Sequence, residues 1–379
     1  MQSKYSLKNI DLINFLFLTL TPIAAIVLTY FWIKIDGFHY GQILLGLGLY
    51  FLTGISITAG YHRLFAHRAY DAHPVLKFLF LIFGSASFEN SALKWCSDHR
   101  LHHLKVDTAE DPYNINEGFF HAHMGWVFLK KNGTVQERFA KDFRQDKLIS
   151  WQHKYNMVIA IVMGIIVPTF IGGYFLGSYL GALAIGVFGR IVLTHHCTFF
   201  INSLCHCLGS TPYTDTNSAK DSWFMALLTF GEGYHNFHHY FQTDYRNGIR
   251  WFHFDPTKWL IKTLSFAGLT HKLKLTPQDK ILAARMQMRV KELKTKFELP
   301  EMVLVEVEKL RAQVLEAMSK VQELKVEYKK NKEEMCTLAM QEVKTKIEAA
   351  KEEFEHCMQQ WEYLVRNYQM AQAEVLLRR

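Results

Sequence analysis

Long apolar runs separated by charged segments dominate the first 275 residues of the chain. Nearly uncharged runs cover residues 11–32, 41–61, 156–176 and 179–201. Each run has about the length that a helix needs to cross a bilayer. The first run is too long, and lacks a small-residue cleavage site, to be a signal peptide. The pattern therefore predicts four transmembrane helices.

Two features modify this picture. Residues 75–93 are also apolar, but the segment is short and contains Glu89 and Asn90, which favours an interfacial or re-entrant helix over a span. In the fourth run, Arg190 and the pair His195–His196 interrupt the apolar sequence. Such groups inside a membrane have functional or paired roles by default, although packing toward the helix bundle or snorkelling is at least as good an alternative.

The distribution of lysine and arginine predicts the topology. The connections near residues 33–40 and 172–178 contain only Lys34 and Asp36 as charged residues, and nearly all other charges lie on the opposite side. By the positive-inside rule that opposite side is cytosolic. The positive-inside rule is also the first explanation of the net charge of +8. Nucleic-acid binding is a weaker explanation, because no base-reading motif is present. The short N-terminus and the lack of a retention signal favour a bacterial inner membrane over the endoplasmic reticulum.

The sequence changes character after residue 280. From Glu301 to Arg379 there is no glycine or proline, and apolar residues recur at heptad a/d spacing. The predicted seam comprises Val303, Val307, Leu310, Val314, Ala317, Val321, Leu324, Tyr328, Met335 and Leu338, then, after a phase slip near 339–343, Val343, Ile347, Ala350, Phe354, Cys357, Trp361, Leu364, Tyr368 and Val375. The slip, or the polar residues 329–332, marks the bend if this segment is a hairpin. We expect a membrane domain over 1–280 and a helical extension over 281–379. The extension either forms a coiled coil that mediates oligomerisation or is a solvated amphipathic helix that rests on the catalytic part, and the two alternatives are even.

Three histidine motifs lie beside the apolar runs: His62-Arg-Leu-Phe-Ala-His67, His99-Arg-Leu-His102-His103 and His235-Asn-Phe-His238-His239. On a helix, positions i, i+3 and i+4 share a face, so each HxxHH motif aims three rings in one direction. Adjacent rings diverge by roughly 100° and can therefore serve two different ions. Imidazole is the commonest protein ligand for iron, zinc and copper. Eight imidazoles exceed the four ligands of a structural zinc site, which favours a two-metal centre.

The cysteines argue against the zinc alternative. Structural zinc sites usually recruit cysteine, but the six cysteines are scattered and form no Cys-x-x-Cys pair. The same scatter does not resemble a disulfide framework and favours a reducing compartment.

A fourth element follows the last apolar run, where Asn202 and His206 are separated by one helical turn. His206 raises the number of candidate ligands to nine, and Asn202 could hold a coordinated water. A pair of histidine-ligated irons beside a membrane suits oxygen activation on an apolar substrate. Two ferrous ions can share the electrons that reduce O2 to an oxidant able to remove hydrogen from a methylene group.

These motifs together resemble the acyl-CoA desaturases of the stearoyl-CoA (delta-9) type, over roughly residues 10–275. The resemblance includes Gly60-Tyr-His-Arg-Leu64, Asp98-His-Arg100, Asp111-Pro112, Gly125-Trp126, Gly231-Glu-Gly-Tyr-His235 and Asp244-Tyr245. It implies an all-α integral membrane fold of four transmembrane helices with a cytosolic helical cap that carries a His-ligated dimetal site, here followed by a C-terminal long helix or coiled coil. It also implies that one iron is surrounded by His62, His103, His206 and His239, with Asn202 reaching it through water, and the other by His67, His99, His102, His235 and His238.

For the substrate, the resemblance implies that Asn90, Lys130 and Lys131 hold the CoA headgroup of a long-chain acyl-CoA. An ordinary juxtamembrane basic pair is an equal alternative for the two lysines. Ser97 stands where animal members have an arginine. This leaves an acyl-carrier-protein or lipid-linked substrate open.

We therefore expect an oxidoreductase that uses O2 and two Fe2+ ions to place a cis double bond, at delta-9, in a saturated acyl chain. The sequence contains no haem-attachment motif, iron–sulfur cysteine quartet or dinucleotide fingerprint. The electrons must then come from a separate donor, of the ferredoxin or cytochrome b5 type with its reductase, which the C-terminal helix could recruit. The rivals are a fatty acyl or lipid hydroxylase on the same scaffold and a His-rich metal transporter, which would carry its ligands inside the spans.

Overall fold

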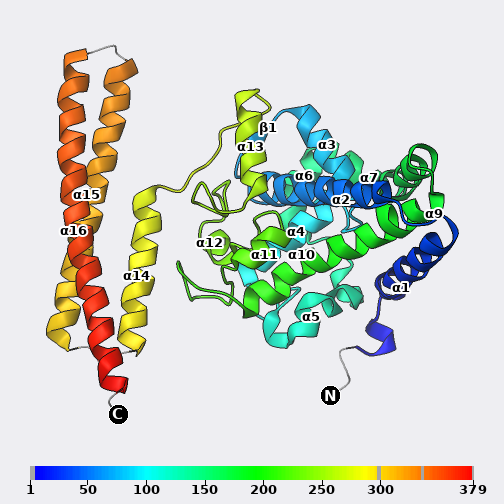
Figure 1. Ribbon diagram of the computed structural model, residues 1–379, viewed down its shortest axis with the longest axis horizontal. Coiled ribbons are helices and arrows are strands. Elements are labelled where there is room, and N and C mark those ends of the chain that lie inside the picture. Colours follow the sequence, from blue (N-terminus) through cyan, green and yellow to red (C-terminus); the bar gives the residue numbers. More distant parts are fainter. Residues whose placement is uncertain (1–4, 297–299, 334–336, 378–379) are drawn as a thin grey trace. The chain divides into compact units, whose positions relative to one another are not determined.

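The computed structural model describes residues 5–296, 300–333 and 337–377, and most of these residues are helical (Figure 1). The chain forms two compact units. Unit 1 comprises Met1–Thr211 with Asp215–Leu275, and unit 2 comprises Pro212–Thr214 with Thr276–Arg379. The expected all-α fold class is confirmed. The functional assignment of the two parts as membrane domain and extension stays a prediction.

Four helices of unit 1 are long and apolar enough to cross a bilayer: Leu12–Ile35, Tyr40–Ala66, Lys147–Phe175 and Tyr179–Cys207. Side chains on the first, such as Ile13 at 79% exposure, have no protein cover and suit contact with lipid. The prediction of four such helices is confirmed, and each helix extends beyond its predicted range at one end or both. By this criterion the chain is a membrane protein.

The first span is a single α-helix, whereas the other three contain wide π-helical turns. The elements are α1 (Leu12–Ile35); α2 (Tyr40–Ile55) with η2 (Ser56–Ala66); α7 (Lys147–Ile161), η6 (Val162–Ile166), α8 (Val167–Phe170) and η7 (Ile171–Phe175); and α9 (Tyr179–Gly181), η8 (Ala182–Gly189) and α10 (Arg190–Cys207).

The two short connections between the spans lie together at one end of the bundle. Gly37 and Gly177 turn the chain with φ of +79° and +76°, a conformation that favours glycine. The Ser178 hydroxyl donates a hydrogen bond to the Asp36 carboxylate, and the Gln42 amide donates to the Ser178 carbonyl at 3.1 Å. These contacts fit the placement of both connections on one side of the membrane.

The ionisable groups in the fourth span have packing partners. The buried Arg190 guanidinium donates to the carbonyls of Ala86 (2.5 Å) and Gly164 (2.8 Å). The His195 ring lies 2.8 Å from the Ser87 carbonyl. Both contacts fit the packing alternative for these residues.

Shorter elements complete unit 1. They are η1 (Leu7–Asn9), α3 (Pro74–Ser85), α4 (Ala92–Lys105), η3 (Ile115–Glu117), α5 (Phe119–His123), η4 (Gly125–Phe128), η5 (Lys130–Asn132), α6 (Glu137–Gln145), α11 (Trp223–Leu228), α12 (His235–Tyr240) and α13 (Pro256–Phe266). Strands β1 (Asp71–Ala72) and β2 (Thr270–His271) pair antiparallel, with Asp71 opposite His271. This pairing ties the start of α3 to the end of α13 (Figure 1).

The apolar segment 75–93 is not one helix, contrary to the sequence prediction. Helix α3 ends at Ser85, and Phe88 and Asn90 then adopt φ of +61° and +77°. The Ser91 hydroxyl accepts from the Lys94 N–H and starts α4. Because of this break, Glu89 and Asn90 lie in the connection between α3 and α4 and not within a helix.

Unit 2 consists of α14 (Gln278–Lys296), α15 (Glu301–Glu333) and α16 (Thr337–Leu377). Helices α15 and α16 run antiparallel, with the Lys320 ammonium 3.0 Å from the Glu353 carboxylate. Their apolar faces and that of α14 share a core of Met286, Val290, Leu293, Val307, Leu310, Val314, Trp361 and Val365. The hairpin alternative for the C-terminal segment is therefore correct.

The bend of this hairpin was placed wrongly. Residues 329–332 and 339–343, the two predicted positions, lie inside α15 and α16. Helix α15 ends at Glu333 and α16 begins at Thr337. The seam position Met335 lies outside the described residues, as does the side chain of Val375. Leu338 is 82% exposed, so the predicted seam does not reach the bend. The structure does not test oligomerisation.

Candidate metal centre

The first histidine motif lies in the wide turns of η2. The His67 N–H donates to the His62 carbonyl at 3.1 Å, a bond between residues five apart. In an ordinary α-helix such residues would point roughly 140° apart. The π-helical turn instead brings the two rings to a centroid distance of 4.8 Å. Wide turns of this kind often mark functional sites.

The second and third motifs lie on α4 and α12, and His206 lies on α10. Within each adjacent pair, the two rings belong to different groups, as the helical geometry predicts. The five-histidine group contains His62, His67, His99, His103 and His238, and the four-histidine group contains His102, His206, His235 and His239. Within each group the ligand atoms lie within 4.8 Å of one another. All nine predicted histidines are thus brought together, although their role as ligands stays a prediction.

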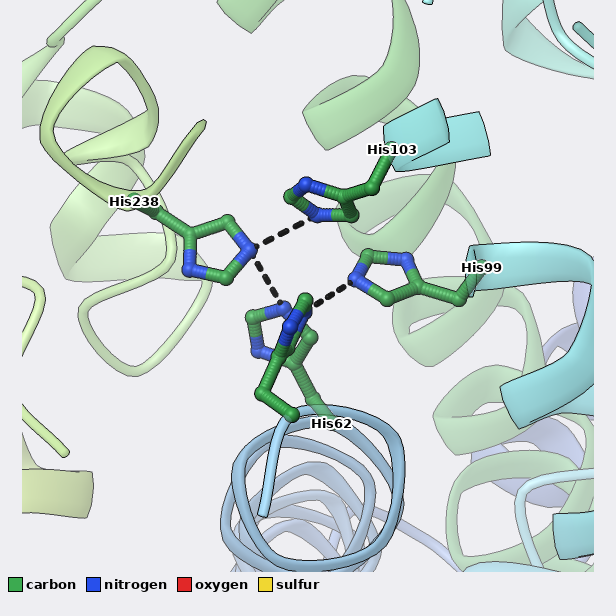
Figure 2. Close-up of side chains that lie close together, drawn as sticks. His62, His99, His103 and His238 are labelled. Atoms are coloured by element: carbon green, nitrogen blue, oxygen red, sulfur yellow. Dashed lines mark hydrogen bonds between the residues drawn. The ribbon is translucent and has the colours of Figure 1, made fainter. Parts of the chain in front are cut away.

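The rings meet through their Nε2 atoms. In the five-histidine group, His238 Nε2 lies 2.9 Å from the Nε2 atoms of both His62 and His103 (Figure 2). The Nε2 atoms of His67 and His99 are 2.8 Å apart. In the four-histidine group, His235 Nε2 lies 3.1 Å from His206 and 3.0 Å from His239. Each group therefore encloses a space of the size of one ion.

The division of the rings differs from the one that the resemblance implied. His62 and His103 were expected with His206 and His239, but they lie with His67 and His99. The wide turn of η2 accounts for His62, because it aligns that ring with His67. His103 follows because it points away from His102 on α4. The earlier division is wrong in this structure.

The donor chemistry fits a metal ion. Burial, together with repulsion from neighbouring rings, holds the pKa values of six histidines well below the usual range, so these rings are neutral: His67, His99, His103, His235, His238 and His239. The Nδ1 of His102 lies 2.9 Å from the Asp111 carboxylate, and that of His62 lies 2.9 Å from Glu232. A proton held at Nδ1 leaves a bare lone pair on Nε2. Neutral rings whose Nε2 atoms converge in this way suit a shared cation.

A buried charge network supports this arrangement. The Glu232 carboxylate accepts from the Arg63 guanidinium at 2.9 and 3.1 Å and from the Asn247 amide at 2.5 Å. Arg63 also pairs with Asp255 at 3.1 Å. Although burial raises the pKa of Glu232, Arg63 and His62 hold it below its ordinary value. Glu232 is therefore ionised beside His62.

A cavity of about 540 Å³ opens onto both histidine groups through His62, His99, His102 and His235. Much of its wall is apolar and includes Phe17, Leu18, Tyr50, Ile57, Phe88, Met157, Ala160, Phe199 and Phe230. Glu89 also lines it and accepts from the Thr198 hydroxyl (2.8 Å) and the Trp95 indole (3.3 Å). Burial raises the pKa of Glu89 to about 7.

The other predicted site residues divide between cavity and surface. Asn90 and Asn202 line the cavity. Lys130 and Lys131 are not among its lining residues, and the Lys130 ammonium donates to the Lys8 carbonyl at 3.0 Å. The roles of Asn90, Asn202, Lys130 and Lys131 stay predictions.

Sequence reasoning missed the residues that support the rings. It gave no role to Glu232, Asp111, Glu89 or Trp95, although the first two lie within the quoted motifs. The signal for Glu232 was its position three residues before His235. Glu89 stood out only as a carboxylate in an apolar segment.

Comparisons with known proteins agree with this geometry. The fatty acid desaturase family model matches residues 40–271. Acyl-CoA desaturase 1 of Saccharomyces cerevisiae is 42% identical over 259 residues, which cover 68% of this chain and 51% of the relative. The probable acyl-CoA desaturase of Schizosaccharomyces pombe is also 42% identical, over 64% of this chain and 51% of the relative. The sn-1 stearoyl-lipid 9-desaturase of Anabaena variabilis is 34% identical over 63% of this chain and 86% of the relative.

The chain spans about half the length of the two yeast relatives. The family model, however, covers more than half of this chain, and its range contains all nine histidines. The chain belongs to the fatty acid desaturase family.

Proposed function

We propose that this protein is an O2-dependent fatty acyl desaturase that introduces a cis double bond, at delta-9, into a saturated acyl-CoA. The observation that carries the proposal is the pair of buried histidine groups that open onto one largely apolar cavity. An acyl chain in this cavity would lie against both groups. Family membership gives the reaction class independent support.

We assign two iron ions to the histidine groups. Bound iron would supply the oxidising power that removes hydrogen from an unactivated methylene group. The protein's own contribution is to keep the rings neutral, to hold their protons at Nδ1 through Glu232 and Asp111, and to exclude water by burial. Asn202 would contribute through a water, as the resemblance implies.

The acyl-CoA assignment follows the names of the two yeast relatives. The cyanobacterial relative is named for a lipid-linked substrate, which keeps that class as the alternative. Asn90 would contact the substrate from the cavity wall, and Lys130 and Lys131 would act from the surface. Ser97, buried on α4, supplies no positive charge.

A separate electron donor, of the ferredoxin or cytochrome b5 type with its reductase, completes the proposal. We place the histidine groups on the cytosolic face by the positive-inside rule. The relatives of 42% identity come from yeasts, so the bacterial inner membrane stays a prediction without support from them. Recruitment of the donor by unit 2 is the alternative that the sequence offered, and the experiment in the next subsection decides between it and unit 1. Oligomerisation through unit 2 stays a prediction.

Neither rival function is favoured. The names of the relatives point to desaturation and not to hydroxylation. A transporter would need its ligands inside the spans, but His62 and His206 lie near the ends of their helices.

The deciding experiment is expression in a host that lacks unsaturated fatty acids, followed by gas chromatography of its lipids. We expect a cis-9 alkene in the wild type and saturated chains alone in the His102→Ala variant. A retained hydroxyl group would establish the hydroxylase instead. Iron analysis of the purified protein should give about two ions per chain, one for each histidine group.

A further inference from the structure

A second, open pocket lies on the surface of unit 1. Arg68, Arg100, Lys141, Asp142 and Gln145 line it. Arg68 is 62% exposed and Lys141 is also exposed. Asp142 is the one carboxylate among these five, and it pairs with Arg68 at 2.5 Å and with Arg100 at 2.8 Å. Three cations against one carboxylate leave the pocket positively charged.

This pocket adjoins the five-histidine group directly. Arg68 follows His67 in the chain, and Arg100 follows His99. The Arg100 guanidinium donates to the carbonyl of Ala66 at 2.9 Å, so it also fixes the backbone just before His67. The His67 and His99 Nε2 atoms are 2.8 Å apart. Two residues that line the pocket are therefore joined through the backbone to two candidate ligands, Arg68 to His67 and Arg100 to His99.

The excess positive charge of the protein belongs to unit 1. Residues 276–379 carry 19 lysines and arginines against 18 acidic residues, whereas the whole chain has a net charge of +8. An acidic partner is thus attracted to unit 1 and not to the C-terminal helices, because long-range steering follows the net field.

The reaction proposed above needs such a partner. Conversion of –CH2–CH2– to –CH=CH– with O2 consumes two electrons and two protons and releases two water molecules. The substrate chain supplies two hydrogens, and both remaining electrons must enter from outside. The acyl cavity is filled by substrate during this step, so electrons need another route to the histidine groups.

We propose that the pocket of Arg68, Arg100 and Lys141 is the docking site of an acidic electron-carrier protein. This inference rests on the proposed function. The carrier's carboxylates would face Arg68 and Lys141, and the electrons would reach the five-histidine group through His67 and His99. Arg100 would stay in place, because it also holds the backbone of η2.

The test uses full-length protein in nanodiscs and two acidic carriers as probes, soluble cytochrome b5 and a plant-type ferredoxin. We expect at least one to bind with an affinity that falls as salt rises. The double variant Arg68→Glu/Lys141→Glu should lower that affinity by roughly tenfold or more, mainly through the association rate. The conservative variant Arg68→Lys/Lys141→Arg should restore it.

Two matched variants reverse exposed lysines elsewhere. Lys262→Glu/Lys274→Glu changes unit 1 outside the pocket, and Lys325→Glu/Lys344→Glu changes unit 2. Both should bind the carrier like the wild type. Equal binding by the pocket variant and the wild type, or a loss confined to the unit 2 variant, would overturn the inference.

Product analysis separates this inference from the proposed function. With dithionite in place of the carrier, the pocket variant should form the same alkene as the wild type. If the wild type forms no alkene with any electron source, the proposed function fails. If it forms alkene while the pocket variant keeps its carrier affinity, the docking inference alone fails.

Discussion

The two histidine groups are built from the same motifs but are supported differently. The five-histidine group is backed by Glu232, whose charge is shared with Arg63. The four-histidine group is backed by Asp111 and by the Ser218 hydroxyl, which lies 2.7 Å from His206 Nδ1. The comparison teaches that ring direction, not motif membership, decides which group a histidine joins. It also predicts that the two groups respond differently to the loss of one member.

The largest effect is expected for His102→Ala. This variant leaves three rings in the four-histidine group, and His102 is 2% exposed, so water cannot easily replace the ring. We expect alkene formation to fall by roughly 100-fold or more and bound iron to drop from about two ions per chain to about one. Gas chromatography and metal analysis measure the two quantities. Full iron content in this variant would contradict the assignment of His102 as a ligand.

A smaller effect is expected when the outer carboxylates are changed. Glu232→Gln should affect the five-histidine group, and Asp111→Asn the four-histidine group, each with a loss of roughly 10- to 100-fold in activity or metal affinity. Mössbauer spectra of protein loaded with 57Fe should show one iron signal altered in each variant, and a different signal in the two. The same altered signal in both variants would mean that the two groups are not separate.

His99→Ala sharpens the contrast with His102→Ala. It leaves four rings in the five-histidine group, so we expect the iron content to stay near that of the wild type. Activity should fall by about tenfold, since a remaining ligand set still holds the ion but in altered geometry. The same two assays apply. If this variant loses iron as His102→Ala does, the four remaining rings do not suffice to hold an ion, and the predicted contrast between the two groups is wrong.

The smallest effect concerns the cavity wall beside the five-histidine group. The Trp95 ring stacks on His99 at 4.9 Å, and its indole N–H donates to Glu89. Because burial raises the pKa of Glu89 to about 7, the folded state binds a proton that the unfolded state releases at lower pH. Stability should therefore fall as pH rises from about 5 to about 7, and stay level above that range.

Glu89→Gln removes this titration. The difference in melting temperature between wild type and variant, measured in detergent at several pH values, should change by a few degrees over the same range. A difference that is constant with pH would show that Glu89 does not titrate there.

Much of the fold could be predicted from local sequence. The four apolar runs and the heptad seam are dense one-dimensional patterns, and residues such as Val307 and Val314 were placed in the core correctly. The break of the segment 75–93 was missed because Phe88 and Asn90 adopt left-handed backbone that propensity does not reveal. Tertiary packing, not local preference, determines that turn.

The candidate site was predicted in membership but not in arrangement. Three motifs identified eight of the histidines, and the ninth, His206, was identified by its position after the last apolar run. Their division into two groups depends on the wide turn of η2, which spacing on an ideal α-helix does not anticipate. Glu232 and Asp111 act through hydrogen bonds that form only when separate segments of the chain meet. The sequence pattern therefore could not predict their supporting role.

The wide turn of η2 has a consequence for anyone who edits this gene. A helix that carries one surplus residue per turn can shed it and relax to the common form without unfolding. Removal of a single residue between His62 and His67 would do this and leave the two imidazoles four residues apart, on one face of an ordinary α-helix. Insertion of one residue would instead turn the second imidazole roughly 120° away from the first, although every histidine were still encoded. The chain should therefore tolerate shortening of this stretch better than lengthening.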